Sequence, residues 1–335
     1  MATLGQDCFD RKDRDAAGSA EAYRRPMIRT LMNRSDWTIL FALAVIWGGA
    51  FLFISVAVRE VPPLTYVWLR LSLAAAALWL VLSWRGTRLG LPKSAWGAIA
   101  ALALLNNVVP FALFGWGQTQ IASGLASILN ATTPIWGVVV AHLFTSDEKM
   151  SPRKLAGVLL GFGGVALMLA PTISTSLGGN ALAQLACVTA SLCYAVAGVW
   201  ARRFRAMGVR PESVATGQLT VGALFMLPVA LIADRPWLLP VPSGTAIAAI
   251  AALAIFCTAL GYVLYFRLID RAGATNALLV TLLVPPVAIL LGALFLGEVL
   301  HIADFAGLAL IALGLAAIDG RLLSLAGPRR LQRAT

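Results

Sequence analysis

One basic side chain stands inside a long apolar stretch of the chain. Arg70 lies about six residues into the apolar segment 64–84, roughly 9 Å from its start at about 1.5 Å per helical residue. A cation at that depth in a membrane is costly and usually has a functional role. Its guanidinium could attract an anionic group such as a carboxylate. Alternatively, the side chain could extend to the nearest membrane surface or pair with Glu60.

Two prolines point to polar interruptions of helices. Pro134 follows Asn130 by four residues, and Pro285 follows Thr281 by four. Because proline has no N–H, the carbonyl four residues earlier loses its helical partner. Each place would set a free carbonyl beside a polar side chain near the middle of a helix, which is typical of ligand sites in membrane carriers. Alternatively, the prolines only kink their helices and Asn130 bonds to a neighbouring helix.

Other polar and aromatic residues in apolar segments are further candidates for ligand contacts. Asn106 and Asn107 are adjacent, and adjacent helical residues point about 100° apart, so at most one faces a cavity; we take Asn107. We add one amide and two aromatic residues: Gln218, Trp47 and Tyr194. Such rings, with Tyr262 and Tyr265, could contact a ligand ring or ammonium group. Most membrane aromatics, however, anchor at interfaces or pack.

Groups that could carry out a reaction or bind a metal are scarce. The chain has two histidines, His142 and His301, and four cysteines without metal-ligand spacing. No carboxylate lies deep in an apolar segment. Glu148 and Glu298 lie at segment ends, where they are expected to cap helices or fix local charge. We therefore expect no enzyme activity, no metal and no cofactor, and a relay of protons through buried acids is disfavoured.

Membrane-spanning helices must position these residues. The 335 residues are 59% apolar and 12% charged, with a mean hydropathy of +0.83, and a chain so poor in charge cannot cover a water-facing surface. A span needs about 20 mostly apolar residues. The sequence predicts an all-α membrane protein with ten transmembrane helices, at 38–58, 64–84, 94–114, 122–144, 154–171, 181–200, 214–233, 246–266, 274–296 and 303–321.

The basic residues alternate with these spans. With the N-terminus placed in the cytoplasm, all but three of the 26 Lys and Arg residues fall in cytoplasmic loops and tails; Arg59 and Arg235 lie outside, and Arg70 lies within a span. This bias follows the positive-inside rule and predicts that both termini are cytoplasmic. It also explains the net charge of +11 through anionic lipid, so no nucleic-acid partner is expected.

The two halves of the chain resemble each other. The stretch that begins at Ala122 and contains Pro134 matches the stretch that begins at Gly273 and contains Pro285, at an offset of 151, while Trp47 falls opposite Tyr194 and Arg70 near Gln218. We predict a disordered tail at 1–36, five-helix repeats at 37–171 and 181–323, and a second tail at 324–335. Five spans is an odd number, so the second repeat is inverted in the membrane. Shared hydrophobicity is the alternative.

Several of these stretches carry a family pattern. Trp47-Gly-Gly-Ala-Phe-Leu-Phe, Pro62-Pro63-Leu64-Thr65 with Arg70, and Leu294-Phe-Leu-Gly-Glu298 resemble EamA-type members of the drug/metabolite transporter superfamily. The resemblance covers about 37–323. It implies ten helices, a location in the bacterial inner membrane, and export or exchange of small metabolites, often amino acids. The first half departs from the pattern, since Ser146-Asp147-Glu148 replaces Gly-Glu and adds one residue.

These features together predict a secondary transporter that works by alternating access. Its substrate would be small and organic, because no ring of deep charges replaces the hydration shell of an ion. A channel that uses the same polar residues, or a non-transport receptor or scaffold, is the alternative. The expected partners are the substrate and the lipid bilayer. The GxxxG pattern at 157–161 could pack within the bundle or join two protomers, which leaves a homodimer open.

Overall fold

A computed structural model describes residues 33–145, 150–175, 179–272 and 280–319, which form helices and no strand. Residues 1–32 of the predicted N-terminal tail, the predicted tail at 324–335 and Glu148 lie outside these residues. The sequence predicts that the first tail reaches residue 36, but residues 34–36 form the first turn of a helix, so its predicted boundary is wrong by a few residues. In chain order the elements are α2 (Arg34–Ala57), α3 (Pro63–Trp84), η1 (Lys93–Ala95), α4 (Trp96–Ala103), η2 (Leu104–Val108), α5 (Val109–Gly117), α6 (Ser123–Asn130), α7 (Thr133–Phe144), α8 (Pro152–Thr175), α9 (Gly179–Ala206), α10 (Pro211–Ala233), η3 (Pro236–Leu238), α11 (Gly244–Ala252), η4 (Leu253–Leu260), α12 (Gly261–Ala272), α14 (Val280–Leu291), η5 (Gly292–Leu296) and α15 (Ile302–Asp319).

Seven helical stretches of the described chain are long and apolar enough to cross a membrane. They are Arg34–Ala57, Pro63–Trp84, Lys93–Gly117, Ser123–Phe144, Ala181–Ala206, Pro211–Ala233 and Gly244–Leu268. Two shorter apolar helices are Leu283–Leu296 and Ile302–Ala317. These nine stretches, with α8, fall on the predicted segments. The all-helical fold is therefore confirmed, while the count of ten membrane crossings stays a prediction.

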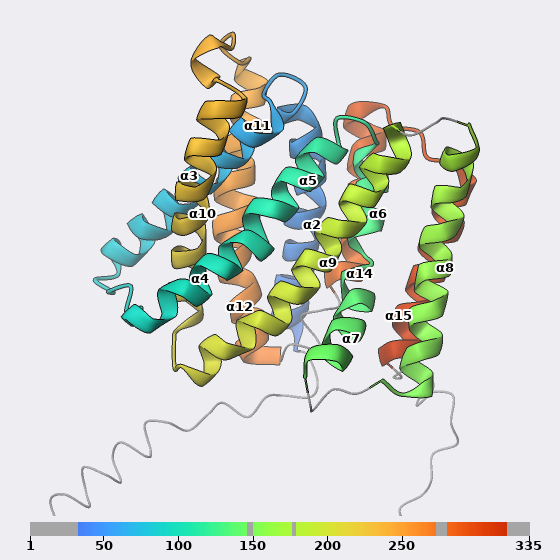
Figure 1. The fold of residues 1–335 in the computed structure, drawn as a ribbon, viewed down its shortest axis with the longest axis horizontal. Coiled ribbons are helices and arrows are strands. Elements are labelled where there is room, and N and C mark those ends of the chain that lie inside the picture. Colours follow the sequence, from blue (N-terminus) through green and yellow to red (C-terminus); the bar gives the residue numbers. More distant parts are fainter. Residues whose placement is uncertain (1–32, 146–149, 176–178, 273–279, 320–335) are drawn as a thin grey trace, which may run out of the picture.

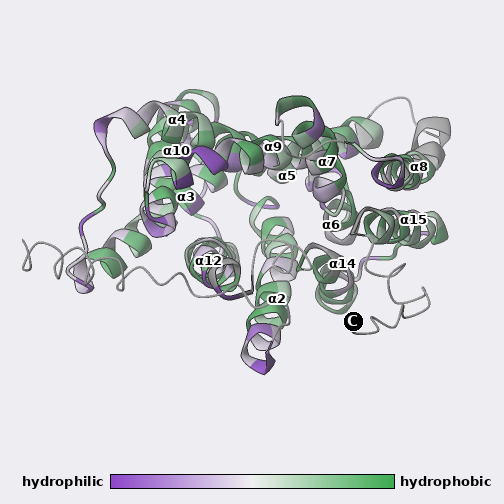
Figure 2. Cartoon of the chain, turned by 90° about the horizontal axis from the view of Figure 1, so that it is seen from below, coloured by the Kyte–Doolittle hydropathy of each residue, from purple (hydrophilic) through white to green (hydrophobic). Residues whose placement is uncertain are grey.

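Large apolar side chains face outward along the bundle. Leu80, Ile232 and Leu294 are 70%, 76% and 68% exposed. Figure 2 shows hydrophobic residues along most of each helix, with hydrophilic residues gathered at ends such as the near ends of α2 and α8. Such an apolar surface suits lipid rather than water.

Local sequence signals determine where helices begin. Asn33 and Asp36 form a reciprocal capping box at the start of α2, which satisfies two of the N–H groups that lack helical partners. The Ser243 side chain caps α11 by accepting a hydrogen bond from the Ala246 N–H. Proline occupies the first turn of α3 and of α10, where its missing N–H costs nothing.

The helix pairs follow an exchange rule: when each helix is replaced by its counterpart in the other half, the observed pairs recur. Helix α8 packs on α15, and α3 packs on α10; both pairs stand at opposite edges of the bundle in Figure 1. Helix α2 packs on α14, α11 and α12, whereas α9, the corresponding helix of the second half, packs on α6, α7 and α5. Exchanging each helix for its counterpart thus reproduces the observed pairs.

The glycine pattern at 157–161 packs inside the bundle. A Cβ added at Gly164 would lie 2.6 Å from the Gly307 carbonyl oxygen, and one at Gly314 would lie 2.5 Å from the Gly157 carbonyl oxygen. Helices α8 and α15 therefore approach until their backbones touch. Of the two sequence alternatives, the structure shows packing within one chain.

The described residues contain three π-helical segments that the sequence did not predict, and two of them interrupt the third and eighth helical stretches. Segment η2 covers Leu104–Val108, and η4 covers Leu253–Leu260. At the repeat offset of 151, residues 104–108 correspond to 255–259, so both repeats are widened at the same place. Short π segments often mark functional sites in helices, and this pair flanks the polar centre of the bundle.

We name the two ends of the bundle by their charge. The basic end carries Arg85, Lys93, Arg203 and Arg210, and it contains the C-terminal ends of α3 and α9. It is the lower end in Figure 1. The opposite end carries Glu60, Asp234 and Glu298.

Candidate functional site

Arg70 points into the bundle and joins both halves. Its side chain is 6% exposed, and Nε donates a hydrogen bond to Thr258 Oγ1 at 2.9 Å. Its guanidinium carbon lies 3.7 Å from the centre of the Phe111 ring, a distance suited to a cation–π contact. Glu60 lies at the opposite end and accepts hydrogen bonds from Ser243. Arg70 therefore neither reaches the membrane surface nor pairs with Glu60.

The π segment η4 positions Thr258, the hydrogen-bond partner of Arg70. The Thr258 hydroxyl donates a hydrogen bond to the Leu253 carbonyl, five residues earlier, at 2.8 Å. This bond spans the widened turn and leaves the oxygen lone pairs of Thr258 directed at Arg70. Thr258 itself is 1% exposed. The irregular backbone thus places a neutral acceptor beside a buried cation.

Four further residues from three helical stretches form a hydrogen-bonded cluster. Asn106 Nδ2 donates to Gln218 Oε1 at 3.1 Å and to the Tyr262 hydroxyl at 3.0 Å. The Tyr262 hydroxyl donates to Asn107 Oδ1 at 2.9 Å. Asn106 and Asn107 both take part, because the π segment η2 brings two adjacent side chains to one side. The sequence argument assumed regular α-helical spacing, which η2 does not have; that at most one of the two side chains faces a cavity stays a prediction.

One donor in this cluster has no partner. Asn107 is fully buried, and its Nδ2 makes no hydrogen bond with the described residues. A buried N–H group without a partner is rare and calls for an explanation. It leaves the cluster with a donor available for a ligand.

The Arg70 contacts and the amide cluster form one site. Phe111 comes four residues after Asn107, and Tyr262 comes four residues after Thr258, so each pair stacks on one helix face about one turn apart. Gly222, four residues after Gln218, lets α10 approach closely: a Cβ there would lie 3.9 Å from Asn107 Cβ. We call this site the central site; it consists of Arg70, Asn106, Asn107, Phe111, Gln218, Thr258 and Tyr262.

The repeat relates the members of the central site to one another. At the offset of 151, Asn107 corresponds to Thr258 and Phe111 to Tyr262. Earlier in the repeats, Arg70 falls near Gln218, which lies 148 residues later. Arg70 of the first half contacts the second-half Thr258. Tyr262 of the second half bonds to the first-half Asn107. The framework is therefore nearly symmetric, but only its first half supplies a charge.

The two aromatic candidates border the central site. Trp47 Nε1 donates to the Cys257 carbonyl at 3.2 Å, next to Thr258, and its ring lies 5.2 Å from that of Tyr265. Tyr194 stacks on Phe114 with ring centres 6.1 Å apart. Tyr194 and Tyr262 both lie within electrostatic range of the Arg70 guanidinium. The structure thus places Trp47 and Tyr194 beside the central site, which contains Asn107 and Gln218.

The polar break at Pro134 is present but lies apart from these contacts. Helix α6 ends at Asn130 and α7 begins at Thr133. The Thr133 hydroxyl donates to the Asn130 carbonyl at 2.8 Å, and the Ser191 hydroxyl donates to the Leu129 carbonyl at 3.1 Å. The carbonyls that the break exposes are therefore bonded within the protein.

The helix break expected at Pro285 is not present, and this prediction is corrected here. Helix α14 continues through Pro285, and Thr281 lies in its first turn, beside the end of the described segment. A proline removes one hydrogen bond and can bend a membrane helix without ending it when neighbouring groups satisfy the freed carbonyl. The two repeats therefore differ at this place.

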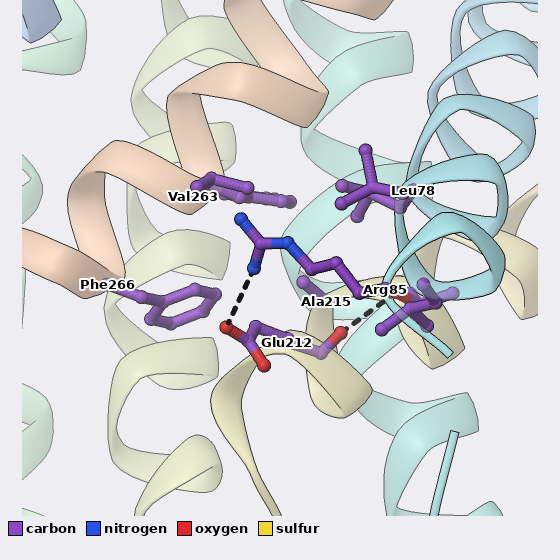
Figure 3. A pocket seen from close by; sticks show the side chains of 10 residues that line it. Leu78, Arg85, Glu212, Ala215, Val263 and Phe266 are labelled. Atoms are coloured by element: carbon purple, nitrogen blue, oxygen red, sulfur yellow. Dashed lines mark hydrogen bonds and ion pairs between the residues drawn. The ribbon is translucent and has the colours of Figure 1, made fainter. Parts of the chain in front are cut away.

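A pocket leads from the basic end toward the central site. It is narrow, with a volume of only about 20 Å³, and is lined by Leu78, Val81, Leu82, Arg85, Glu212, Ala215, Thr216, Tyr262, Val263 and Phe266. Figure 3 shows Arg85 and Glu212 facing each other across it, with Val263 and Phe266 on one side and Leu78 on the other. Arg85 Nη1 lies 3.9 Å from Glu212 Oε1, and both side chains are about half exposed. Tyr262 belongs to both the pocket and the central site, so it connects them.

Carboxylates tie the two halves together at the opposite end. Glu60 accepts from Ser243 N–H and hydroxyl, both at 2.6 Å. Asp234 Oδ2 accepts from Thr65 N–H at 2.7 Å and from its hydroxyl at 2.9 Å. The Ser243 hydrogen bonds hold the pKa of Glu60 below its usual value. Each carboxylate caps the first turn of a helix in the other half.

Glu298 makes a third cap of the same kind. Its carboxylate accepts from the Ser123 N–H and hydroxyl, each at 2.8 Å, and from the Gly124 N–H at 3.1 Å. It thereby fixes the end of the ninth predicted span to the start of α6. The expected capping role of Glu298 is observed. Beside it, Ser55, Arg59 and Gln118 line a polar pocket of about 250 Å³.

The family profile described as the EamA-like transporter family matches the chain twice, over residues 36–170 and 181–318. The chain belongs to this family. The resemblance seen in the sequence is thereby confirmed, and the central site is the meeting place of the two matched copies. An EamA-like transporter is a membrane transporter, which agrees with the apolar helices.

Several curated relatives match most of the chain. The transporter YoaV of Bacillus subtilis is 24% identical over 82% of this chain and 94% of its own length. A transporter of Archaeoglobus fulgidus is 26% identical over 83% and 96%. The inner membrane transporter YedA of Escherichia coli K12 is 27% identical over 81% and 86%. A protein of known crystal structure aligns with a TM-score of 0.62 at 21% identity, over 90% of this chain and all of that one; it supports the fold alone.

Proposed function

We propose that the protein is a secondary transporter of small organic metabolites that works by alternating access. One observation carries the proposal: the central site is buried at the contact of the two repeats, and its hydrogen bonds cross from one repeat to the other. A rocking motion of the repeats would change the access to this site from one side to the other.

The proposed topology has ten spans in two inverted five-helix repeats. The exchange rule of the helix pairs supports it, because each pair in one half has its counterpart in the other. The distribution of basic residues supports a cytoplasmic basic end and cytoplasmic termini. A reporter that is active only in the cytoplasm, fused to the C-terminus, tests this orientation; an inactive reporter on the folded, membrane-inserted protein would contradict it.

The two ends of the bundle differ in the contacts that join the halves. Three double or triple carboxylate caps hold the halves together at the opposite end, whereas the pocket at the basic end reaches Tyr262. In the proposed cycle this is the state closed to the outside. Its counterpart would break the caps and close the pocket between α3, α10 and α12.

The test is transport by the purified protein in liposomes. Uptake of a labelled panel of amino acids, organic acids and other metabolites is measured with and without unlabelled compound inside. Saturable uptake that rises with preloading supports a carrier, and flux that does not saturate indicates a channel. Asn107→Ala is expected to reduce uptake, and Arg205→Gln, an exposed change on α9, is the control. No flux for any compound by the folded protein would contradict the proposal.

A further inference from the structure

The central site holds one positive charge that none of the described residues balances. The Arg70 side chain is almost fully buried, and its recorded contacts are the Thr258 hydroxyl, the Phe111 ring and the Tyr66 hydroxyl. None of these groups carries a negative charge that would balance the guanidinium. The ion pairs recorded for the described residues both lie at the basic end and do not involve Arg70.

The acidic groups that could have served as counter-ions are engaged elsewhere. Glu60, Asp234 and Glu298 hold helix starts at the opposite end, and Glu212 faces Arg85. The repeat offers no internal match either, because the residue near Arg70 in the other half is a neutral glutamine. A desolvated charge without a counter-ion is strongly unfavourable. Within the part of the chain that the structure describes, no acidic group balances Arg70, which points to a ligand as the source of the negative charge.

We infer that the central site binds an organic monoanion, a carboxylate, and that the protein exchanges one such anion for another across the membrane. The inference rests on the transport function proposed above. A carboxylate can accept about four hydrogen bonds. Arg70 supplies charged donors, and the unpaired Asn107 Nδ2 supplies a neutral donor from the third helical stretch. The Phe111 and Tyr194 rings offer apolar surface to the rest of the ligand.

The charge of the loaded site separates a monoanion from other ligands. With a bound monoanion the site is neutral overall. With a zwitterionic amino acid it stays singly positive, because none of the described central-site residues is acidic. A neutral ligand also leaves Arg70 uncompensated. A monoanion is therefore the ligand class whose binding removes the buried charge.

The same charge favours exchange over one-way transport. An empty site must carry the uncompensated Arg70 charge through the reorientation, whereas a site loaded with a monoanion does not. Charge inside the membrane raises the barrier to such movements. Reorientation is therefore faster when the site carries an anion in both directions of the cycle. Uptake into a vesicle then depends on anion preloaded inside it.

Two sets of matched compounds test the inference. Phenyllactate, phenylalanine and phenyllactamide share one skeleton and are an anion, a zwitterion and a neutral compound; lactate, alanine and lactamide form a smaller set. Binding is measured as thermal stabilisation of the purified protein, since a ligand that binds only the folded state stabilises it. Exchange is measured as uptake of labelled carboxylate into liposomes with and without unlabelled carboxylate inside.

The variants separate charge from structure. Arg70→Gln is expected to weaken binding of the carboxylate about 10- to 100-fold, the range for loss of charge-assisted hydrogen bonds, and to remove the dependence on preloading. Arg70→Lys keeps the charge and should keep the preference for the anion. Thr258→Val keeps the charge but removes the oxygen that orients it, so binding should weaken without a change of preference. Arg205→Gln, which removes an exposed arginine, should behave like the unmodified protein.

The possible results test the anion site and the transport function separately. Stronger binding of the zwitterion or the neutral compound, or unchanged carboxylate binding by Arg70→Gln, overturns the anion site and leaves a transporter of another substrate class. Carboxylate binding without flux keeps the anion site and overturns the transport function on which exchange depends. If neither carboxylate binds to the folded protein, the inference is wrong.

Discussion

Replacing Tyr262 by phenylalanine removes one hydroxyl from the middle of the central site and keeps the ring. The hydroxyl accepts a hydrogen bond from Asn106 at 3.0 Å and donates one to Asn107 at 2.9 Å. Asn106 keeps its bond to Gln218, but Asn107 loses its recorded side-chain partner. The ring itself should fit, because the first repeat has Phe111 at the corresponding place.

The size of the effect follows from the orphaned amide. One hydrogen bond contributes about 1 kcal/mol net, and leaving a buried polar group unpaired costs about 1–3 kcal/mol. Asn107 is 0% exposed, so bulk water does not replace the lost hydroxyl. We expect Tyr262→Phe to lower the free energy of unfolding by about 2–4 kcal/mol.

The assay is equilibrium unfolding in mixed micelles with increasing denaturing detergent. Tyr265→Phe is the matched control on the same helix, since no hydrogen bond is recorded for that hydroxyl among the described residues; its change should stay within about 0.5 kcal/mol. Adding Asn107→Leu to Tyr262→Phe removes both partners, so the pair should cost less than the sum of the single changes. Equal stability of Tyr262→Phe and Tyr265→Phe would refute the reasoning.

Three further predictions concern the helix ends and packing. Glu298→Gln removes the charged acceptor of the first α6 amides, so their hydrogen exchange should accelerate; unchanged exchange would speak against a closed opposite end. The Ser243 bonds lower the pKa of Glu60, so the stability they provide is present above its ordinary pKa of about 4.3 and is lost as pH falls through the lower folded pKa. Glu60→Gln should therefore flatten the acid limb of an unfolding curve, and an unchanged limb contradicts this. Gly164→Ala puts a methyl group 2.6 Å from an α15 carbonyl and should destabilise the protein by about 1–3 kcal/mol, whereas Gly163→Ala has open space and should not, as thermal unfolding of both variants can show.

The sequence predicts the helices better than it predicts their contacts. Apolar length and turn residues are local properties, so seven of the predicted spans coincide with long apolar helices of the structure. The depth of Arg70 is also readable, because it depends only on its distance from Pro62-Pro63. Its partner is not, since Thr258 lies 188 residues away and is one of many apolar-segment threonines and serines.

The π segments explain the main misses at the site. A regular helix would turn Asn106 and Asn107 to different sides, whereas the widened turn brings both to Tyr262. No residue type in η2 (Leu104–Val108) signals such a turn in the sequence. The repeat offset does contain the signal: it relates Asn107 to Thr258 and Phe111 to Tyr262. An alignment of the two halves extended to the third helix would have identified Thr258.

The two ends of the α3–α10 pair show where the bundle opens most easily. At the opposite end, Asp234 accepts two short hydrogen bonds from Thr65, and bonds of this charge-assisted kind contribute about 1.5–3 kcal/mol each. At the basic end, Arg85 and Glu212 approach to 3.9 Å while about half exposed, and such surface pairs contribute about 0–1 kcal/mol. The same two helices are therefore held firmly at one end and weakly at the other. Opening the pocket at the basic end breaks the weaker contact, whereas opening the opposite end requires a gain elsewhere. In an exchanger, a bound anion on Arg70 would supply that gain by drawing the two repeats together around a neutral site.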